Sequence, residues 1–493
     1  MFDLQTLDER REAIANATPS KHKSAMGQFM TPMGIARFMA NMFNPLCGKH
    51  IKLLDAGAGI GSLTAAFTER AAVENASSME CEAWELDPKL HSPLAVTLAA
   101  CSDLITEDGG KFKGVVQSED FILSFADLFS GEKMAEPTHA FLNPPYKKIH
   151  SASAHRKALS DCGIETTNLY SAFVALALTA LTTGGELVAI TPRSFCNGTY
   201  FRPFRKLILS KAALVQIHIF ESRTQAFQGD EVLQENVIFH LVKGGKQGAV
   251  VVSSSSDASF SDLRVKTTPY DEIVLPGDKE NIFHLAIEDE GVETSAAMAI
   301  YRHTLEDLGL SVSTGPVVDF RLREHLCVDA GTDRAPLVHS HHFENGFVLH
   351  PKPGAKKPNY IHVNDETRKW MMASGCYVVV RRLSSKEEQR RIVPAVFLPN
   401  SGAGDLVGFD NKTNIIHRAK KGLEVDVAKG MAVYLGSTFA DRWLRRFSGH
   451  TQVNAGDLRA IRYPDMATLT SWGKTVGKTM LSQAAIDHLV RGF

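Results

Sequence analysis

Segments that read as strands and helices alternate through the first half of this chain, and this alternation restricts the fold more than any other feature. Lys52–Leu54 has the apolar character of a buried strand, the residues from Gly61 to about Asn75 are helical in pattern, and Glu80–Leu86 is again strand-like. The alternation continues with strands predicted at Phe121–Ala126, Thr138–Leu142 and Glu186–Ile190 and with helices predicted at His91–Cys101 and Asn168–Leu181. Such alternation is typical of an α/β fold with a mainly parallel sheet.

Two further strands are predicted near the end of this region. Asn236–Val242 and Ala249–Val252 flank the pair Gly244-Gly245, which is the pattern of a hairpin. Such a hairpin would append antiparallel strands to the parallel sheet. The acidic stretch Asp257–Glu293 follows it and is predicted to form the boundary of the first domain.

The distribution of charge indicates a second domain. At 493 residues the chain exceeds one ordinary domain, and residues 301–493 carry 27 Lys and Arg against 19 Asp and Glu, whereas residues 1–300 carry 27 against 36. A basic C-terminal part indicates a polyanionic partner, because phosphate contacts dominate the affinity for nucleic acids; a basic solvated surface would have the same composition. We predict an α/β domain over residues 1–300 and a second domain over residues 301–493.

Composition argues against several classes of protein. No window approaches 18 consecutive apolar residues, and the first residues lack the basic-then-apolar order of a signal peptide. The seven cysteines are an odd number without C-x-x-C spacing, which argues against a disulfide framework and a zinc knuckle. We therefore expect a soluble, cytoplasmic protein that does not bind membranes.

Three predicted strand ends carry residues suited to a nucleoside. The first strand ends in the loop Asp55-Ala56-Gly57-Ala58-Gly59-Ile60-Gly61, whose glycines allow a ligand to approach closely, although the same spacing serves dinucleotides. Glu85 at the second strand end could accept both ribose hydroxyls, and Asp127 at the third could accept from an adenine amino group; a single acid there is otherwise a turn former. Asp55 at the loop mouth would repel a pyrophosphate and suit the cationic end of S-adenosylmethionine, which favours this cofactor over NAD.

The tetrapeptide Asn143-Pro144-Pro145-Tyr146 follows the predicted strand that ends at Leu142. The prolines fix φ and prevent a helix, so the Asn143 amide and the Pro144 carbonyl would be held rigidly at the strand end. Tyr146 offers a flat face beside them. Two acceptors and a stacking platform can hold a planar amino group and direct it at an electrophile, which indicates methyl transfer to an exocyclic nitrogen.

The order of these motifs resembles a known family. Gly27-Gln28-Phe29-Met30-Thr31-Pro32, then Asp55–Gly61, then Asn143–Tyr146, then a long C-terminal region is similar to the gamma-class DNA adenine-N6 methyltransferases of restriction-modification systems. Four further segments resemble the PstI/BsuBI-type branch: Asn168–Tyr170, Thr191-Pro192, Val232–Ile238 and Gly449–Asn454. The resemblance implies a Rossmann-like methyltransferase sheet that uses S-adenosylmethionine, followed by an α+β target-recognition domain.

The resemblance also implies a role for each matching residue of the cofactor pocket. Thr31 would touch the methionine part of the cofactor, Glu85 would hold its ribose and Asp127 its adenine. The residues assigned to cofactor binding are Thr31, Asp55, Gly57, Gly59, Glu85 and Asp127.

The catalytic residues implied by the resemblance are Asn143, Pro144, Pro145 and Tyr146. Asn143 and the Pro144 carbonyl would accept hydrogen bonds from N6 of an adenine flipped out of duplex DNA, and Tyr146 would stack on that base. The family places an aromatic residue on the other face of the base as well. Phe239 fits this role by its position in the strand, a loop residue, Phe227, is the alternative, and Phe239 is otherwise a core residue.

The C-terminal region is expected to select the DNA sequence, beginning at Val312–Leu326. Basic clusters at Lys352–Lys357, Lys420-Lys421 and Arg442–Arg446 could each touch phosphates or be solvated surface. Small and amide side chains in Gly449–Asn454 suit contacts with the DNA backbone and with base edges, although such a loop often serves only as a turn. The residues assigned to DNA contacts are Arg381, Arg382, Arg445, Arg446, His450, Thr451, Gln452 and Asn454.

Two further points are whether the chain binds a metal ion and which substrate it modifies. The histidines His339, His341, His342 and His350 are interpreted as polar loop residues rather than metal ligands, because their spacing is irregular and methyl transfer needs no metal. An RNA or protein-glutamine methyltransferase and a non-catalytic DNA-specificity subunit stay open as rivals. We expect a monomer that acts on double-stranded DNA, with a restriction endonuclease encoded separately.

Overall fold

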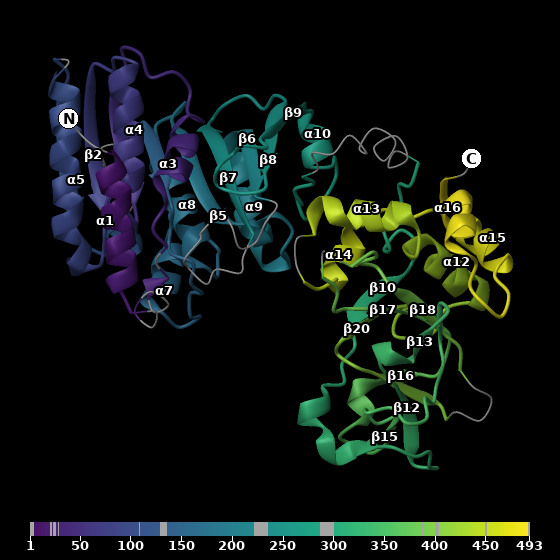
Figure 1. The fold of residues 1–493 in the computed structure, drawn as a ribbon. Helices are drawn as coiled ribbons and strands as arrows, with labels where there is room; N and C mark the ends of the chain where they lie inside the picture. Colours follow the sequence, from purple (N-terminus) through teal and green to yellow (C-terminus); the bar gives the residue numbers. More distant parts are fainter. Residues whose placement is uncertain are drawn as a thin grey trace. The chain divides into compact units, whose positions relative to one another are not determined.

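The computed structural model describes residues 4–19, 22, 26–27, 29–107, 109–128, 136–220, 235–285, 300–385, 388–399, 404–448 and 451–491. The chain divides into two compact units, unit 1 (residues 1–287) and unit 2 (residues 288–493) (Figure 1). Within the described ranges, no helix combines the length and the apolar character that a membrane crossing requires.

Unit 1 is built on a nine-stranded sheet with the strand order β3-β2-β1-β4-β5-β7-β6-β8-β9. The first five strands in this order run parallel, β7 is antiparallel to β5 and β6, β8 is parallel to β6, and β9 is antiparallel to β8. The strands are β1 (His50–Ala56), β2 (Ser78–Trp84), β3 (Lys111–Gln117), β4 (His139–Leu142), β5 (Glu186–Pro192), β6 (Ala212–Phe220), β7 (Asn236–Lys243), β8 (Val250–Ser255) and β9 (Arg264–Thr268). The predicted α/β class is therefore confirmed.

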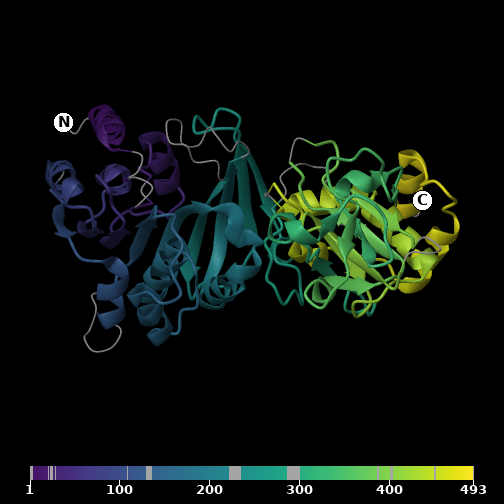
Figure 2. The same ribbon diagram turned by 90° about the horizontal axis from the view of Figure 1, so that it is seen from below.

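Helices cover both faces of this sheet, which explains why its central strands are apolar almost throughout. Alternate residues of β1 point to opposite faces: Leu53 belongs to the core under α3, α4 and α5, and Leu54 to the core under α6, α8 and α9. The two groups of helices lie on opposite sides of the sheet (Figure 2). The helices are α1 (Leu4–Ala17), α3 (Met33–Ala40), α4 (Ser62–Val73), α5 (Pro88–Glu107), α6 (Phe121–Leu128), α7 (Ala154–Asp161), α8 (Leu169–Ala180), α9 (Arg202–Lys211) and α10 (Tyr270–Ile273).

The prediction of a strand at Phe121–Ala126 is wrong, because these residues begin helix α6. Asp120 caps this helix: its Oδ1 accepts hydrogen bonds from the N–H groups of Ile122 and Leu123 at 3.0 and 3.1 Å. The third parallel strand is β3 instead. As the edge strand of the sheet, β3 is largely exposed and has no continuous apolar run, so the sequence pattern did not reveal it.

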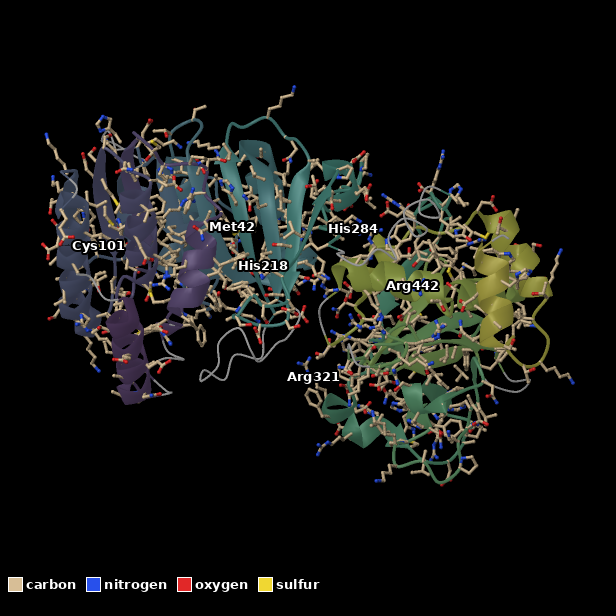
Figure 3. The ribbon with its side chains drawn as sticks, turned by 45° about the horizontal axis from the view of Figure 1, so that its top comes forward. Met42, Cys101, His218, His284, Arg321 and Arg442 are labelled. Carbon is tan, nitrogen blue, oxygen red and sulfur yellow. The ribbon has the colours of Figure 1, made fainter. Side chains whose placement is uncertain are left out.

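The antiparallel strands appended to the sheet are confirmed, but their pairing differs from the predicted hairpin. The two predicted strands, β7 and β8, are not neighbours, because β6 lies between them. The consecutive antiparallel pairs are β6 with β7 and β8 with β9. β6 is an apolar strand buried for most of its length, and it carries the buried His218 (Figure 3). The His218 ring lies 4.6 Å from that of Phe38 and 5.5 Å from that of Phe260, measured between centroids.

Unit 2 contains two mixed sheets and a group of helices. One sheet has six strands in the order β10-β20-β17-β18-β14-β13, and the other has five in the order β11-β15-β12-β19-β16. The strands are β10 (Ser311–Thr314), β11 (Leu326–Cys327), β12 (Arg334–Val338), β13 (Phe343–Glu344), β14 (Phe347–Val348), β15 (Tyr360–His362), β16 (Met371–Ala373), β17 (Tyr377–Arg381), β18 (Pro394–Phe397), β19 (Leu406–Phe409) and β20 (Thr413–His417). The helices are α12 (Val425–Leu435), α13 (Thr438–Phe447), α14 (Ala455–Ala460), α15 (Met466–Lys474) and α16 (Gln483–Arg491).

Helices α12 and α15 of unit 2 cross with their backbones in direct contact. A Cβ atom built on Gly473 would lie 1.7 Å from the carbonyl oxygen of Asp426, and one built on Gly430 would lie 1.8 Å from that of Leu469. Only glycine leaves room for this approach, so these two positions fix how closely the two helices pack.

Buried histidine rings cluster between β12 and β15 of unit 2. The ring of His342 lies 4.1 Å from that of His341 and 5.0 Å from that of His350, measured between centroids. His342 Nδ1 accepts a hydrogen bond from the His339 N–H at 3.0 Å, and its Nε2 donates to Asn359 Oδ1 at 2.8 Å. Burial lowers the pKa of His342 to about 3 and that of His341 to about 4, so both rings are held neutral.

Acidification is expected to destabilise unit 2 through these histidines. The pKa of His342 in the folded protein lies below its usual value of 6.5, so its contribution to stability is complete above pH 6.5 and is lost as the pH falls toward 3. The thermal-unfolding midpoint should therefore decrease between pH values of about 7 and 5. In His342→Gln this decrease should be smaller, whereas His303→Gln, at an exposed position, should keep the wild-type dependence. An unchanged pH dependence in His342→Gln would contradict this account.

Candidate functional site

The loop after β1 contains three glycines whose backbone conformation other residues adopt only with strain. Gly57, Gly59 and Gly61 have φ angles of 82°, 59° and 87°. The N–H groups of Gly57 and Ala58 both donate to the Trp84 carbonyl at 2.9 Å, which ties the loop to the end of β2. The loop leads directly into α4, whose N-cap is Gly61.

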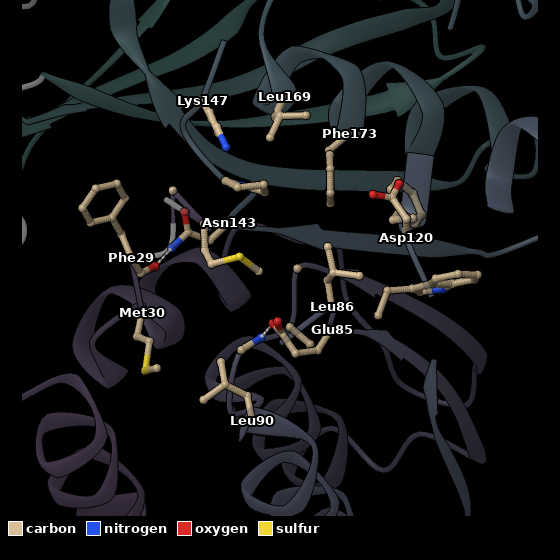
Figure 4. Close-up of a pocket in the computed structure, with 18 of the residues that line it drawn as sticks. Phe29, Met30, Glu85, Leu86, Leu90, Asp120, Asn143, Lys147, Leu169 and Phe173 are labelled. Carbon is tan, nitrogen blue, oxygen red and sulfur yellow. Dashed lines mark hydrogen bonds between the residues drawn. The ribbon is translucent and has the colours of Figure 1, made fainter. Parts of the chain in front are cut away.

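A cavity opens at the carboxyl ends of β1, β2 and β4, beside this loop. Its wall is formed by four segments: the glycine loop from Gly57 to Leu63, the end of β2 from Trp84 to Leu86, residues 119–122, and the acceptor loop at Asn143 and Pro145 (Figure 4). The wall is completed by Met26, Gly27, residues 29–31, Leu90, Lys147, His155, Leu169 and Phe173. The cavity therefore lies where ligands bind in open α/β sheets. It brings four of the predicted cofactor residues together with Asn143 and Pro145 of the predicted acceptor loop, whereas Pro144 and Tyr146 are not part of its wall.

Glu85, which the sequence assigns to cofactor binding, lies in this wall. Its Oε2 accepts a hydrogen bond from the Gly59 N–H at 2.8 Å, and its Oε1 accepts from the Asp87 N–H at 2.8 Å. Burial, together with the nearby Asp87 charge, raises the pKa of Glu85 above its usual value. Thr31, Gly57 and Gly59 also line the cavity.

Asp55 is not part of the cavity wall, contrary to the prediction that it lines the pocket. It is fully buried beneath the glycine loop, where its Oδ2 accepts a hydrogen bond from the Thr64 hydroxyl at 2.7 Å. Burial raises the pKa of Asp55 to about 7. The side chain faces α4 because successive strand residues point to opposite faces, so an acid at the strand end need not face the ligand.

Asp127 is not at a strand end, because it lies within helix α6; its side chain lies outside the described residues. Two acids that follow β3, Glu119 and Asp120, line the cavity, and Asp120 is the one that caps α6. The sequence carries a signal for it, since an Asp before the apolar run Phe121-Ile122-Leu123 is typical of a helix N-cap.

Asp120 is paired with His155 from α7, which sequence reasoning did not single out. His155 Nε2 donates to Asp120 Oδ2 at 2.8 Å, and both residues line the cavity. Burial raises the pKa of Asp120, but the bonds from His155 and from the Leu123 and Ile122 N–H groups outweigh it, so that the pKa is lowered. The hydrogen bond to Asp120 in turn raises the pKa of His155.

Asn143 is the first residue of the acceptor loop, Asn143–Tyr146, and directly follows β4. Its Nδ2 donates to the Phe29 carbonyl oxygen at 2.6 Å and to the Thr31 hydroxyl at 2.8 Å. The Tyr146 hydroxyl donates to Asn143 Oδ1 at 3.2 Å, and the Tyr146 ring lies against Phe29 with 5.5 Å between centroids. Pro144 is buried, which supports the predicted rigidity of this turn.

Phe239 does not face the cavity, which contradicts its assignment as a base-stacking residue. It is only 1% exposed and packs in the core of unit 1, with its ring edge-on to Phe195 at 5.4 Å. The alternative interpretation, that Phe239 is an ordinary core residue of an apolar strand, is the one the structure supports. Phe227, the other candidate, lies outside the described residues.

The arginines predicted to touch DNA already have partners within unit 2. Arg381 forms an ion pair with Glu388, Arg382 donates to the Asn411 carbonyl at 3.2 Å, and Arg445 Nε bonds Asp441 Oδ2 at 2.6 Å. Arg446 also has an interaction partner. These side chains hold unit 2 together, and a phosphate would have to share them.

The described residues of the segment after α13 that were predicted to contact DNA, Thr451, Gln452 and Asn454, also differ in their surroundings. Asn454 caps helix α14 in a reciprocal arrangement with Asp457, and the buried Arg391, which sequence reasoning missed, donates to the carbonyl oxygens of Ser448 and Gln452. Thr451 is exposed, and His450 lies outside the described residues. The buried Arg391 guanidinium group thus holds Ser448 and Gln452 by their backbone carbonyls.

One lysine of the predicted cluster, Lys357, and one of the histidines, His339, form ion pairs with buried or half-buried carboxylates. Lys357 Nζ lies 2.7 Å from Asp319 Oδ2 and 3.4 Å from Asp410 Oδ2, and His339 Nδ1 lies 3.1 Å from the same Asp410 oxygen. Asp319, His339 and Asp410 bring possible metal ligands within 4.8 Å of one another, but the ammonium group of Lys357 lies among them and balances their charge. By contrast, Arg321 projects from the surface, with its guanidinium 5.6 Å from the ring of the exposed Phe320 (Figure 3).

Comparisons with known proteins agree with the geometry of the site. Residues 143–227 match the Eco57I restriction-modification methylase family, whose match begins at the acceptor loop. The chain is 45% identical to the type II methyltransferase M.BsuBI of Bacillus subtilis over 493 residues, covering 98% of this chain and 96% of that protein. It is 41% identical to the type II methyltransferase M.PstI of Providencia stuartii over 486 residues, again covering 98% and 96%.

A solved structure shares the fold of the chain at low sequence identity. The type IIL restriction-modification enzyme MmeI, solved in complex with DNA, aligns with a TM-score of 0.50 and 12% identity, covering 86% of this chain and 63% of that one. The predicted resemblance to the PstI/BsuBI-type branch is confirmed by the two sequence relatives. The chain therefore belongs to the type II methyltransferases of restriction-modification systems, in the branch that contains M.BsuBI and M.PstI.

Proposed function

We propose that this chain transfers a methyl group from S-adenosylmethionine to N6 of a specific adenine in duplex DNA. The observation that carries the proposal is a shared wall: Asn143 and Pro145 of the acceptor loop line the same cavity as Gly57, Gly59 and Glu85. An amine held at the acceptor loop would therefore lie next to a cofactor held at the glycine loop. The family membership supports methyl transfer in a restriction-modification system, and the site supports the choice of amine and cofactor.

The residues of the cavity fit an adenosyl cofactor. The positive φ angles of Gly57 and Gly59 allow close approach, and Glu85, buried but hydrogen-bonded to the loop, is placed to accept ribose hydroxyls. Asp120 takes over the role expected of Asp127, the acceptance of a hydrogen bond from the cofactor adenine. Apolar side chains near Asp120, among them Phe121 and Ile122, would supply a hydrophobic environment for a purine ring. When bound, S-adenosylmethionine supplies an electrophilic methyl group on a sulfonium sulfur.

The acceptor loop would orient the attacking nitrogen. Asn143 Oδ1 and the Pro144 carbonyl would each accept one N6 hydrogen, which favours a pyramidal nitrogen with its lone pair directed at the methyl carbon. No strong base is needed before the in-line displacement. Stacking on Tyr146 would contribute roughly 1 to 3 kcal/mol, comparable to the cost of unstacking a base from the duplex. With Phe239 in the core, Phe227 is our candidate for the second stacking residue.

Unit 2 would recognise the DNA sequence. Its basic balance, 27 Lys and Arg against 19 Asp and Glu over residues 301–493, suits a polyanionic partner. Because Arg381, Arg382 and Arg445 are paired internally, the exposed Arg321 and the polar loop at Thr451 and Gln452 are better placed to reach DNA. We further propose that the chain acts as a monomer beside a separately encoded restriction endonuclease.

Labelled S-adenosylmethionine distinguishes this function from its rivals. The purified chain is incubated with the cofactor and duplex DNA, RNA or protein, and label is expected in duplex DNA as N6-methyladenine. Label in RNA or in protein glutamine, but not in DNA, would reject the proposed substrate. No label in any of them would favour the non-catalytic specificity subunit. Methylation-aware sequencing of the product then identifies the recognised sequence.

Loss of His155 is expected to weaken cofactor binding. Without the hydrogen bond from His155 Nε2, the Asp120 carboxylate is no longer held in the cavity wall, so calorimetry on His155→Ala should show about 3- to 10-fold weaker binding of S-adenosylmethionine. The affinity of the wild-type chain for S-adenosylmethionine should increase as the pH is lowered and His155 is protonated, since the protonated imidazole is the stronger hydrogen-bond donor to Asp120. His150→Ala, at an exposed position in the same segment, is the matched control. Equal affinities for all three proteins would contradict this role for Asp120 and His155.

A further inference from the structure

The amide group of Asn143 has two ends that differ in chemistry, and only one of them can serve the proposed reaction. An amino group on the substrate needs an acceptor, which is the Oδ1 end; the Nδ2 end carries two donors of its own. An amide rotated by half a turn would present N–H groups to the substrate amine and could not hold it. The correct orientation of this side chain is therefore a requirement of catalysis.

Two acceptors from the segment before α3 fix this orientation. Both Nδ2 hydrogens are used, one by the Phe29 carbonyl oxygen at 2.6 Å and one by the Thr31 hydroxyl at 2.8 Å. In a rotated amide, Oδ1 would face the Phe29 carbonyl oxygen, and two acceptors at that distance repel each other. Oδ1 is left with one bond, from the Tyr146 hydroxyl at 3.2 Å, and with a second lone pair for the substrate.

The segment that supplies these acceptors is itself held in place at both ends. At one end, the Gly27 carbonyl accepts a hydrogen bond from the Tyr146 N–H at 3.1 Å, and a Cβ on Gly27 would approach that nitrogen to 3.1 Å. At the other end, Pro32 precedes α3 and its carbonyl accepts from the Ala36 N–H at 3.0 Å. Thr31 is only 4% exposed, so water does not compete effectively for its hydroxyl oxygen.

We infer that Thr31 is a positioning residue for methyl transfer, which acts by orienting the Asn143 amide. Its hydroxyl oxygen accepts from Asn143, while its side chain lines the cofactor cavity. Thr31 thus joins the two halves of the site: it is placed to touch the cofactor and it fixes the group that holds the acceptor. This inference rests on the proposed function, because it assumes that Asn143 receives the amine to be methylated.

Two substitutions separate this role from a structural one. Thr31→Val keeps the shape of the side chain and removes the hydroxyl, and Thr31→Ser keeps the hydroxyl and removes a methyl group. We expect Thr31→Val to lower kcat by about 10- to 100-fold at saturating cofactor and DNA, with the cofactor Kd changed by less than about 3-fold. Thr31→Ser should retain kcat within about 3-fold of wild type. Thermal unfolding should show similar midpoints for both variants.

The possible results distinguish failure of this inference from failure of the proposed function. If the wild-type chain methylates DNA and Thr31→Val has the same kcat, the positioning role is overturned and the proposed function stands. A Thr31→Val variant that loses cofactor affinity while kcat at saturation is kept would also overturn it, because Thr31 would then serve the cofactor only. A Thr31→Ser variant as impaired as Thr31→Val would show that the methyl group matters rather than the hydroxyl. A wild-type chain that labels no DNA would instead reject the proposed function.

Discussion

Asn143→Ala is expected to abolish methyl transfer while leaving cofactor binding intact. The Asn143 amide would hold the substrate amine, and its loss leaves the nitrogen unoriented in front of the methyl group. Removing one group that stabilises a transition state typically costs about 100- to 1,000-fold in kcat, and the loss of orientation adds to this. Under the proposed function, cofactor binding would depend on other residues that line the cavity, among them Glu85 and Asp120. Incorporation of labelled methyl groups and calorimetry with S-adenosylmethionine measure the two effects separately.

A matched control for this variant is Asn41→Ala, at an exposed residue that follows α3. It should have wild-type rate and affinity. Calorimetry that showed loss of cofactor affinity in Asn143→Ala would contradict the assignment of the amide to the substrate. Activity of Asn143→Ala within about 10-fold of wild type would exclude the acceptor loop as the catalytic element.

Gly473→Ala is expected to destabilise unit 2 severely. The added Cβ would lie 1.7 Å from the Asp426 carbonyl oxygen, so helices α12 and α15 would have to separate. Alanine is favoured over glycine in a helix by about 1 kcal/mol, but overpacking of a core costs 1 to 3 kcal/mol or more, and here the obstacle is backbone that cannot rotate away. We expect a net loss of about 3 kcal/mol, which for a unit of this size lowers the thermal-unfolding midpoint by roughly 6 to 12 °C.

Gly477→Ala provides the comparison, because no atom lies within 4 Å of the added Cβ and its backbone does not require glycine. This variant should match or slightly exceed wild type in stability. Scanning calorimetry of both proteins tests the pair. A Gly473→Ala midpoint within about 1 °C of wild type would show that the two helices can shift apart at little cost.

The central part of unit 1 could be predicted from the sequence for a physical reason. Strands β1, β4 and β5 are buried on both faces and therefore appear as short apolar runs; Gly57 follows β1, Gly185 precedes β5, and Asn143-Pro144 follows β4. The acceptor loop and the glycine loop are recognisable because their chemistry requires specific residue types in sequence. The predictions at Asn143, Thr31 and Glu85 therefore agree with the wall of the cavity.

The errors arose where local pattern and tertiary environment disagree. The apolar run at Phe121–Phe125 is short enough to suit a strand or a buried helix, and the Asp120 cap decides for the helix. Misplacing that element moved the predicted adenine-binding acid from Asp120 to Asp127. Pairing of β7 with β5 and β6 rather than with β8 depends on long-range contacts that a turn sequence does not encode.

Side-chain roles in unit 2 were the least predictable from sequence. Arg381 and Arg445 looked like phosphate ligands because basic residues cluster there, but both are engaged by nearby acids: Glu388 in the segment that follows β17, and Asp441 one turn before Arg445 in the same helix, α13. Arg391 carried no sequence signal at all, although it is fully buried and anchors the polar loop. Composition reports how much charge a region has, and only the fold shows which charges are already neutralised.

Units 1 and 2 are each formed by one uninterrupted stretch of chain, divided after residue 287. A single genetic crossover near that point can therefore replace all of unit 2 without splitting any strand of the nine-stranded sheet. Under the proposed function, such an exchange would give a protein with new sequence specificity and unchanged methylation chemistry. The architecture thus suits the diversification of host-protection systems by modular recombination, and it offers the same route to their engineering.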